Sequence, residues 1–185
     1  MVFARNTEPF LGSSSRELLT GSPALFGCPL DLTSTYRKGT GEAPQQIRLV
    51  SDSIETYSPL LDRDFSDTPF SDLGDLELSG LSIKAALEKV RETAATILEN
   101  GAKPCCIGGE HTLTLPIVQA IKRVYPEILI LHIDAHSDLR DSYEGSSTNH
   151  ATVMKLVSDL VGSDRLVQLG IRAGTREEFD WMHEN

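Results

Sequence analysis

The chain has 185 residues, 39% of them hydrophobic and 24% charged, and a formal net charge of −10. This composition is that of a folded globular protein rather than a disordered one. The acidic charge argues against a nucleic-acid partner, because such proteins carry a clustered basic surface. No apolar run approaches the roughly 20 residues that a membrane span requires, and no secretory signal is visible. We therefore expect a cytoplasmic protein with no nucleic-acid or membrane partner.

The three cysteines are Cys28, Cys105 and Cys106. They form no Cys-x-x-Cys pair, so the sequence does not support a zinc knuckle or a redox motif. We expect them to be buried small hydrophobic residues in a reducing compartment.

The predicted elements alternate between strands and helices. After an N-terminal arm (1–20, helical around 15–20) we predict strands at 22–31, 103–109, 127–135 and 165–172, and helices at 43–54, 81–101, 112–125 and 150–162. A capping box from Thr175 to Glu178 begins a further helix. The strand at 127–135 is almost continuously apolar, which is typical of parallel strands covered on both faces, and the strand at 165–172 is also expected to be buried. Residues 62–77 hold six acids and one base, and we interpret them as a solvated acidic loop.

This alternation predicts an α/β fold with a mostly parallel sheet and right-handed crossovers. In such sheets, ligands bind beyond the carboxyl ends of the strands. Catalytic or metal-binding residues are therefore expected where the strands end.

Two predicted strand ends carry unusual polar residues. One is the Gly-Gly-Glu-His turn that ends at His111, and the other contains Asp134, His136 and Asp138. Residues two apart in an extended chain point to the same face, so these two carboxylates and an imidazole should converge. Neighbouring carboxylates repel each other unless a proton or a cation bridges them. Mixed Asp and His ligands suit Mn²⁺, Fe²⁺, Co²⁺ or Zn²⁺ better than Ca²⁺.

Two further polar residues near these strand ends are not expected to bind the metal themselves. His132 has the same parity but lies one step deeper in its strand, so we expect a hydrogen-bonded core histidine or one that supports a metal ligand. Glu110 is expected to stabilise the turn rather than to bind the metal.

These motifs, in this order, resemble the ureohydrolase family of arginases and agmatinases, and the loop that follows Asp138 is similar to loops of bacterial and archaeal agmatinases. The segments 27–31, 36–39 and 169–172 fit the same pattern, so the resemblance spans roughly residues 22–185. It implies one ureohydrolase-like domain over 1–185 with a three-layer α/β/α sandwich, similar to arginases and deacetylases. It also implies a binuclear Mn²⁺ cofactor.

The resemblance assigns roles residue by residue. His111, Asp134 and Asp138 match ligands of one manganese, and His136 with a bridging Asp134 matches ligands of the other. A hydroxide held there would attack the guanidinium carbon of the substrate, with Asp138 orienting it. His150 matches the family's proton-shuttling histidine, which gives the leaving amine its proton.

The substrate implied first is agmatine, a small cation hydrolysed to putrescine and urea. Asp141 or Glu144 would face its second cationic end. Guanidinobutyrate remains an alternative, because Arg140 would pair with a substrate carboxylate. Arginine is a further alternative. The family also implies a homo-oligomer, a trimer or a hexamer.

One departure from the family pattern is large. Residues 139–185 lack the later Asp-x-Asp motif that completes both metal sites, and they lack the glutamate that grips the guanidinium. We therefore expect the C-terminal part of the fold to be missing and the 185-residue chain to have little or no activity. A non-catalytic metal-binding fragment is the second hypothesis. A zinc amidohydrolase of the deacetylase type is the third, and metal analysis would separate it from a Mn²⁺ pair.

Overall fold

The computed structural model describes residues 3, 8–13 and 15–185 of the chain. Its helices and strands are β1 (Pro23–Cys28), α1 (Ala43–Ser51), β2 (Tyr57–Ser58), β3 (Arg63–Asp64), β4 (Ser71–Asp75), α2 (Ile83–Glu99), β5 (Lys103–Gly108), α3 (Thr114–Val124), β6 (Ile130–Ile133), α4 (Val153–Val161), β7 (Leu166–Leu169) and α5 (Arg176–Glu184). Short 3₁₀ turns occur at Phe10–Gly12, Thr40–Glu42, Phe65–Asp67, His111–Leu113 and Ser163–Arg165. None of the helices described is long and apolar enough to cross a membrane.

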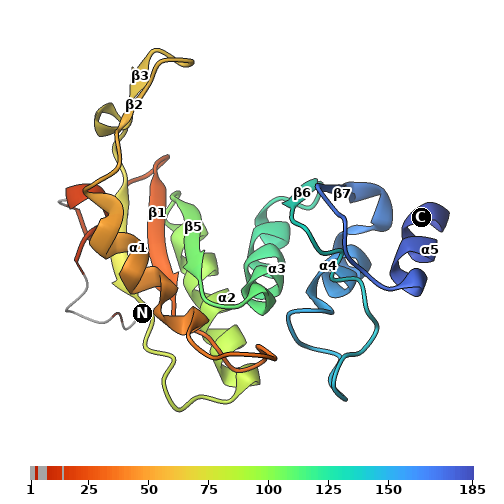
Figure 1. Ribbon diagram of the computed structural model, residues 1–185. Helices are drawn as coiled ribbons and strands as arrows, with labels where there is room; N and C mark the ends of the chain where they lie inside the picture. Colours follow the sequence, from red (N-terminus) through yellow and green to blue (C-terminus); the bar gives the residue numbers. More distant parts are fainter. Residues whose placement is uncertain (1–2, 4–7, 14) are drawn as a thin grey trace.

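The strands form two parallel sheets and one small hairpin. The larger sheet has the order β4-β1-β5, the smaller one pairs β6 with β7, and β2 and β3 form the antiparallel hairpin. Among the described residues, no backbone pairing joins β5 to β6, and Figure 1 shows helix α3 between the two sheets. The predicted α/β class with parallel strands is confirmed, but the strands are divided between two sheets.

Strand β1 shows why the larger sheet is the middle of three layers. Its residues Ala24 and Phe26 pack in one cluster with Val90 of α2. The other face meets α1, because a Cβ placed on Gly27 would lie only 2.8 Å from the Cβ of Pro44. Helices therefore cover both faces of β1, as the resemblance implied.

Helix α2 follows its sequence pattern closely. The Ser82 hydroxyl accepts a hydrogen bond from the backbone N–H of Ala85 at 3.3 Å, which caps the first turn. Gly101, just past the C-terminus, has the left-handed φ of 74° that favours glycine. The prediction of a helix between these two signals is confirmed.

The acidic segment 62–77 differs from its prediction. Its residues 71–75 form the fully buried strand β4 rather than a solvated loop. The guanidinium of Arg48, itself buried, donates two hydrogen bonds to Asp72, at 2.8 and 2.9 Å, and a third to Asp75. Burial of these carboxylates is possible because this cation compensates them.

The smaller sheet is covered on one face only. Ile130 and Leu166 pack into the cluster formed with α4, together with Trp181 of α5. On the opposite face, Leu131 is 55% exposed and Ile133 is 73% exposed. The prediction that both faces of the strand at 127–135 are covered is therefore wrong for this face.

Two smaller expectations also need correction. Residues 15–20 contain no helix, whereas residues 1–2, 4–7 and 14 of the predicted arm lie outside the described residues. Cys28 is buried, and its hydrogen bond with Cys106 together with burial raises the pKa of its thiol. Cys105, however, is exposed on strand β5, so not every cysteine is a core residue.

Candidate metal centre

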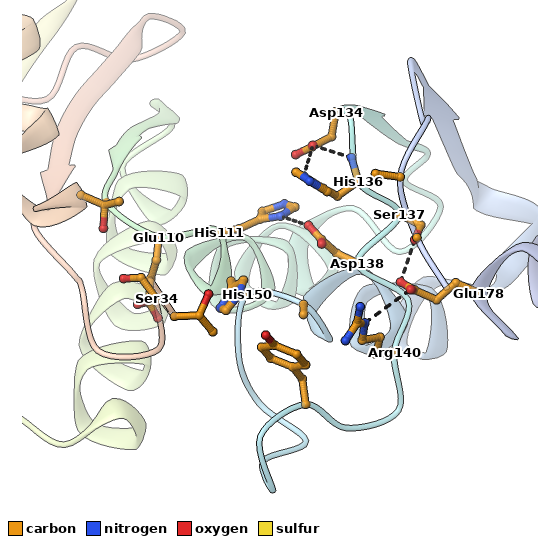
Figure 2. A pocket seen from close by; sticks show the side chains of 17 residues that line it. Ser34, Glu110, His111, Asp134, His136, Ser137, Asp138, Arg140, His150 and Glu178 are labelled. Carbon is orange, nitrogen blue, oxygen red and sulfur yellow. Dashed lines mark hydrogen bonds and ion pairs between the residues drawn. The ribbon is translucent and has the colours of Figure 1, made fainter. Parts of the chain in front are cut away.

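A cavity of about 560 Å³ lies at the carboxyl ends of β5 and β6, where the rule for parallel sheets predicts a ligand site. Its walls come from the loop after β1, the turn after β5, the loop after β6 and the start of α5. Figure 2 shows His111, Asp134, Asp138 and His150 pointing toward this space. The cavity therefore collects residues that are far apart in the sequence.

The turn after β5 carries His111 into the cavity. A Cβ on Gly109 would lie 2.0 Å from the backbone oxygen of Leu30, so any other residue would collide with the loop after β1. The backbone N–H of Glu110 donates to that same Leu30 oxygen at 3.0 Å. The second glycine of the motif thus permits the close backbone approach that brings His111 forward.

His111 and Asp138 meet across the two sheets. Nδ1 of His111 lies 2.7 Å from Oδ2 of Asp138. Asp138 has a left-handed backbone φ of 53°, which is uncommon for a residue other than glycine. A residue with this φ needs surrounding structure to hold it.

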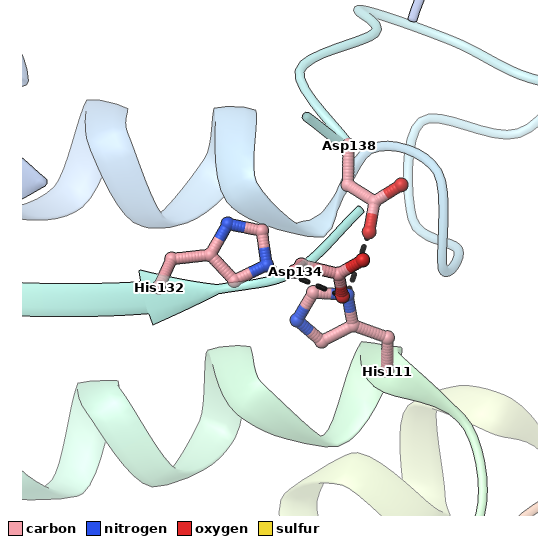
Figure 3. A group of neighbouring side chains, drawn as sticks. All are labelled: His111, His132, Asp134 and Asp138. Carbon is pink, nitrogen blue, oxygen red and sulfur yellow. Dashed lines mark hydrogen bonds and ion pairs between the residues drawn. The ribbon is translucent and has the colours of Figure 1, made fainter. Parts of the chain in front are cut away.

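Four side chains form a compact group of possible metal ligands. One ligand atom from each of His111, His132, Asp134 and Asp138 lies within 4.8 Å of the others, as Figure 3 shows. Nε2 of His132 is buried without a hydrogen-bond partner and lies 3.5 Å from Oδ2 of Asp134. An unpaired buried nitrogen beside clustered carboxylates fits a site that takes up a further polar group or an ion.

The charge states of the group suit a cation. Burial acts to raise the pKa of Asp134, but the hydrogen bond from the His136 backbone N–H and the nearby His111 and His132 lower it overall. Burial, followed by the nearby His111, lowers the pKa of His132. An ionised carboxylate beside a neutral imidazole is the form in which these groups bind divalent metals. The donor set of the Asp134 and Asp138 carboxylates with the His111 imidazole therefore fits a divalent transition metal.

His136, predicted as a ligand, lies apart from this group. Its side chain is 66% exposed, and its Nδ1 lies 3.5 Å from Oδ1 of Asp134. The two residues do contact, but the compact group contains His132 in the place where we expected His136. The role of His136 as a ligand stays a prediction.

His150 is held from two sides. Its backbone N–H donates to the hydroxyl of Thr33 at 3.2 Å, and its Nδ1 lies 3.5 Å from the same oxygen. Its ring meets that of Tyr143 edge-on, with centroids 5.7 Å apart. The Thr33 hydroxyl in turn donates to the buried carboxylate of Glu110 at 2.8 Å. Glu110 therefore stabilises the turn, as expected, and also connects it to His150.

The predicted substrate residues have different positions. The Arg140 guanidinium lies 3.4 Å from Glu178 and 4.8 Å from the centre of the Tyr143 ring. Asp141 and Glu144 are exposed and are not among the described residues that line the cavity. Their role in substrate binding stays a prediction.

Sequence reasoning missed three residues that shape the site. Thr33 carried no signal, because nothing local distinguishes it from the neighbouring polar residues. Gln168 lies inside a predicted strand, and its contact with His132 depends on pairing between β6 and β7. Glu178 was recognised only as part of a capping box, although its position three residues after Thr175 was the one available signal.

The comparisons with known proteins agree on one family. A model described as the arginase family matches residues 22–185. The agmatinase of Bacillus subtilis is 42% identical over 161 residues, covering 87% of this chain and 56% of that protein. The guanidinobutyrase of Pseudomonas aeruginosa is 34% identical, with 92% of this chain and 55% of that protein covered.

A solved structure gives the same result in three dimensions. The agmatine ureohydrolase of Thermoplasma volcanium superimposes with a TM-score of 0.80 at 33% identity, covering 97% of this chain and 59% of that one. The chain thus spans a little over half the length of the relatives that it matches.

Proposed function

Because this chain belongs to the arginase family, we propose that it takes part in the manganese-dependent hydrolysis of agmatine to putrescine and urea. The convergence of His111, Asp134 and Asp138 on one cavity supports a metal-dependent reaction. Agmatinases among the relatives support the substrate class.

In this proposal His111, Asp134 and Asp138 hold one Mn²⁺, and Asp134 with His136 contributes to a second. When bound, the ions would supply a nucleophile at neutral pH, because metals lower the pKa of bound water. The remaining work falls to the side chains of the cavity. Asp138 would orient that nucleophile with its Oδ1, while its Oδ2 faces His111.

His150 is the proposed proton donor to the leaving amine. A histidine suits this role because its ordinary pKa lies near neutral pH. The Thr33 hydroxyl gives its own hydrogen to Glu110 and so faces His150 with a lone pair. This arrangement favours a hydrogen on Nδ1 of His150 and supports proton exchange through Nε2.

The lack of a free cationic side chain in the cavity is the observation that favours agmatine. Of the four carboxylates that line it, Asp134 and Asp138 would be neutralised by the bound ions, which leaves Glu110 and Glu178. Arg140 is the only lysine or arginine among the described lining residues, and Glu178 and Tyr143 already occupy its guanidinium. A substrate with two cationic ends therefore fits better than one with a carboxylate, which would need a free cation.

The test measures metal binding and substrate preference separately. Calorimetry with Mn²⁺ should show binding to the chain, strongly weakened in His111→Asn and unchanged in the control His183→Asn, an exposed histidine. With Mn²⁺ present, agmatine should bind more tightly than 4-guanidinobutyrate or arginine. Tighter binding of 4-guanidinobutyrate would replace agmatine as the substrate. Absence of Mn²⁺ binding, or stoichiometric Zn²⁺ in its place, would overturn the proposal.

Turnover is a third readout. Urea release should be weak, because the resemblance assigns only Asp134 and His136 of this chain to the second metal. Binding of Mn²⁺ without any urea release would favour the non-catalytic metal-binding alternative. The proposal further places the reaction in polyamine formation in the cytoplasm, with a trimer or hexamer as the assembly.

A further inference from the structure

The buried carboxylate of Glu178 contacts the loop after β6 with both oxygens. Its Oε1 accepts hydrogen bonds from the Ser137 hydroxyl at 2.7 Å and from the Leu139 backbone N–H at 3.0 Å. Its Oε2 accepts from the Thr175 backbone N–H at 2.7 Å and lies 3.4 Å from Nε of Arg140. Figure 2 shows Glu178 reaching toward Ser137 and Arg140 from its helix. One carboxylate thus contacts three of the four loop residues 137–140, all except Asp138.

These contacts lie on both sides of the residue with the unusual backbone. Ser137 and Leu139 flank Asp138, whose left-handed φ of 53° is unfavourable for a residue with a side chain. In this conformation the Asp138 carboxylate reaches Nδ1 of His111 at 2.7 Å. Two hydrogen bonds from the neighbours to a single buried oxygen compensate that cost and fix the direction of the side chain.

We propose that Glu178 is a positioning residue of the metal centre, which holds Asp138 in the conformation that presents its carboxylate to the metal. This inference rests on the metal site of the proposed function but not on the identity of the substrate. Glu178 contacts none of the candidate ligands through its own side chain and therefore acts through the loop.

Helix capping alone does not account for these contacts. The capping box uses Oε2 and the backbone of Thr175. Oε1 makes both of its hydrogen bonds with the loop, 39 and 41 residues away along the chain. The two oxygens therefore have separable roles, and variants can distinguish them.

Glu178→Gln is the main test. An amide has only one acceptor oxygen for these four donors. Its NH₂ group would oppose two donors if it faced Thr175 and Arg140, but only the Leu139 N–H if it faced the loop, where the Ser137 hydroxyl can accept. The contact with the loop is therefore the one that glutamine loses.

The expected result for Glu178→Gln is a roughly 10–100-fold weaker affinity for Mn²⁺ by calorimetry, which is typical when a residue that orients a ligand is removed. Bound Co²⁺ should also show a changed visible spectrum. The matched control is Glu177→Gln, an exposed neighbour with the same charge change, which should alter neither.

Two further variants separate positioning from helix stability. Ser137→Ala removes one loop contact and should weaken Mn²⁺ binding while leaving the capping box intact. Thr175→Ala removes the side-chain cap and should lower the melting temperature with unchanged Mn²⁺ affinity. The proposal is overturned if Thr175→Ala weakens binding as much as Ser137→Ala, or if folded Glu178→Gln binds Mn²⁺ like the wild type. If the wild type binds no divalent metal, both the positioning role of Glu178 and the proposed metal site are wrong. If the wild type binds Mn²⁺ and the Glu178→Gln and Ser137→Ala variants bind it equally well, only the positioning role of Glu178 is wrong.

Discussion

The side-chain amide of Gln168 donates a hydrogen bond to Nδ1 of His132 over 2.8 Å. Its nitrogen also donates to the backbone oxygen of Ser137 at 2.8 Å, so both amide hydrogens are used. Nδ1 must therefore accept, and the ring hydrogen lies on Nε2, which faces Asp134. In this tautomer neither ring nitrogen of His132 has a lone pair free for a metal, so His132 would support Asp134 rather than bind the ion itself. The expected hydrogen-bonded core histidine is confirmed, with its tautomer set by the strand beside it.

Gln168→Leu should remove the hydrogen bond that fixes the tautomer of His132. The wild-type ring should give the ¹⁵N NMR signature of a hydrogen on Nε2, and the variant should give a mixture of both forms. The unpaired Ser137 oxygen should also lower the free energy of unfolding by about 1–3 kcal/mol. Gln45→Leu, on the exposed side of α1, is the control and should change neither. A wild-type ring protonated on Nδ1 would contradict this assignment.

Asp72 should make stability depend on pH. Although burial acts to raise its pKa, hydrogen bonds from Arg48 lower it below the ordinary value of 3.8. A carboxyl group with a lower pKa in the folded state stabilises the protein above its unfolded pKa, and this contribution is lost as pH falls through the folded pKa. The melting temperature should therefore fall from about pH 5 downward. Asp72→Asn should be less stable at neutral pH and have a shallower acid slope; an unchanged slope would refute the assignment.

Thr33→Val tests the connection between Glu110 and His150. Valine has nearly the shape of threonine but leaves Glu110 without the hydroxyl and the His150 N–H without its acceptor. We expect a loss of about 1–3 kcal/mol in the free energy of unfolding, measured with denaturant. Thr33→Ser keeps both contacts and should lose less. Equal losses in the two variants would show that the methyl group, not the hydroxyl, matters.

The uncovered face of the smaller sheet should promote self-association. Leu131, Ile133 and Leu169 are each at least half exposed on this face, and exposed apolar patches beside strand edges favour contacts between copies. Ile133→Lys should shift the chain toward monomer in light scattering after size-exclusion chromatography. Leu60→Lys, a substitution at the 92% exposed tip of the hairpin, serves as the control. An equal shift in the control would point to net charge instead of the sheet face.

The sequence predicted where helices and strands lie better than it predicted which neighbouring elements bury them. Helix α2 was readable because its cap, its periodicity and its terminal glycine all lie within its own residues. The burial of Asp72 was not, because it depends on Arg48, 24 residues away. The exposed face of β6 could not be predicted either. An apolar strand indicates that burial of its side chains is favourable, but it does not show whether another element packs against them.

In the candidate site, too, contacts within one segment could be predicted and contacts between distant segments could not. The spacing of Asp134 and Asp138 within one segment predicted that they converge, and the structure brings them together with His111. The contributions of Gln168 and Glu178 come from later segments that reach the site only through the fold. Gln168 is explained by its place in a predicted strand and Glu178 by its place in a capping box. The sequence alone therefore gave no reason to connect either residue with the site.

The absence of backbone pairing between β5 and β6, among the described residues, gives a bound ion a mechanical role. His111 follows β5 and Asp138 follows β6, so an ion held by both would cross-link two sheets that have no shared ladder. A ligand that binds only the native state raises its stability with the logarithm of ligand concentration. The stability of the arrangement of the two sheets would then depend on the concentration of free metal, as well as on the packing of α3 between them.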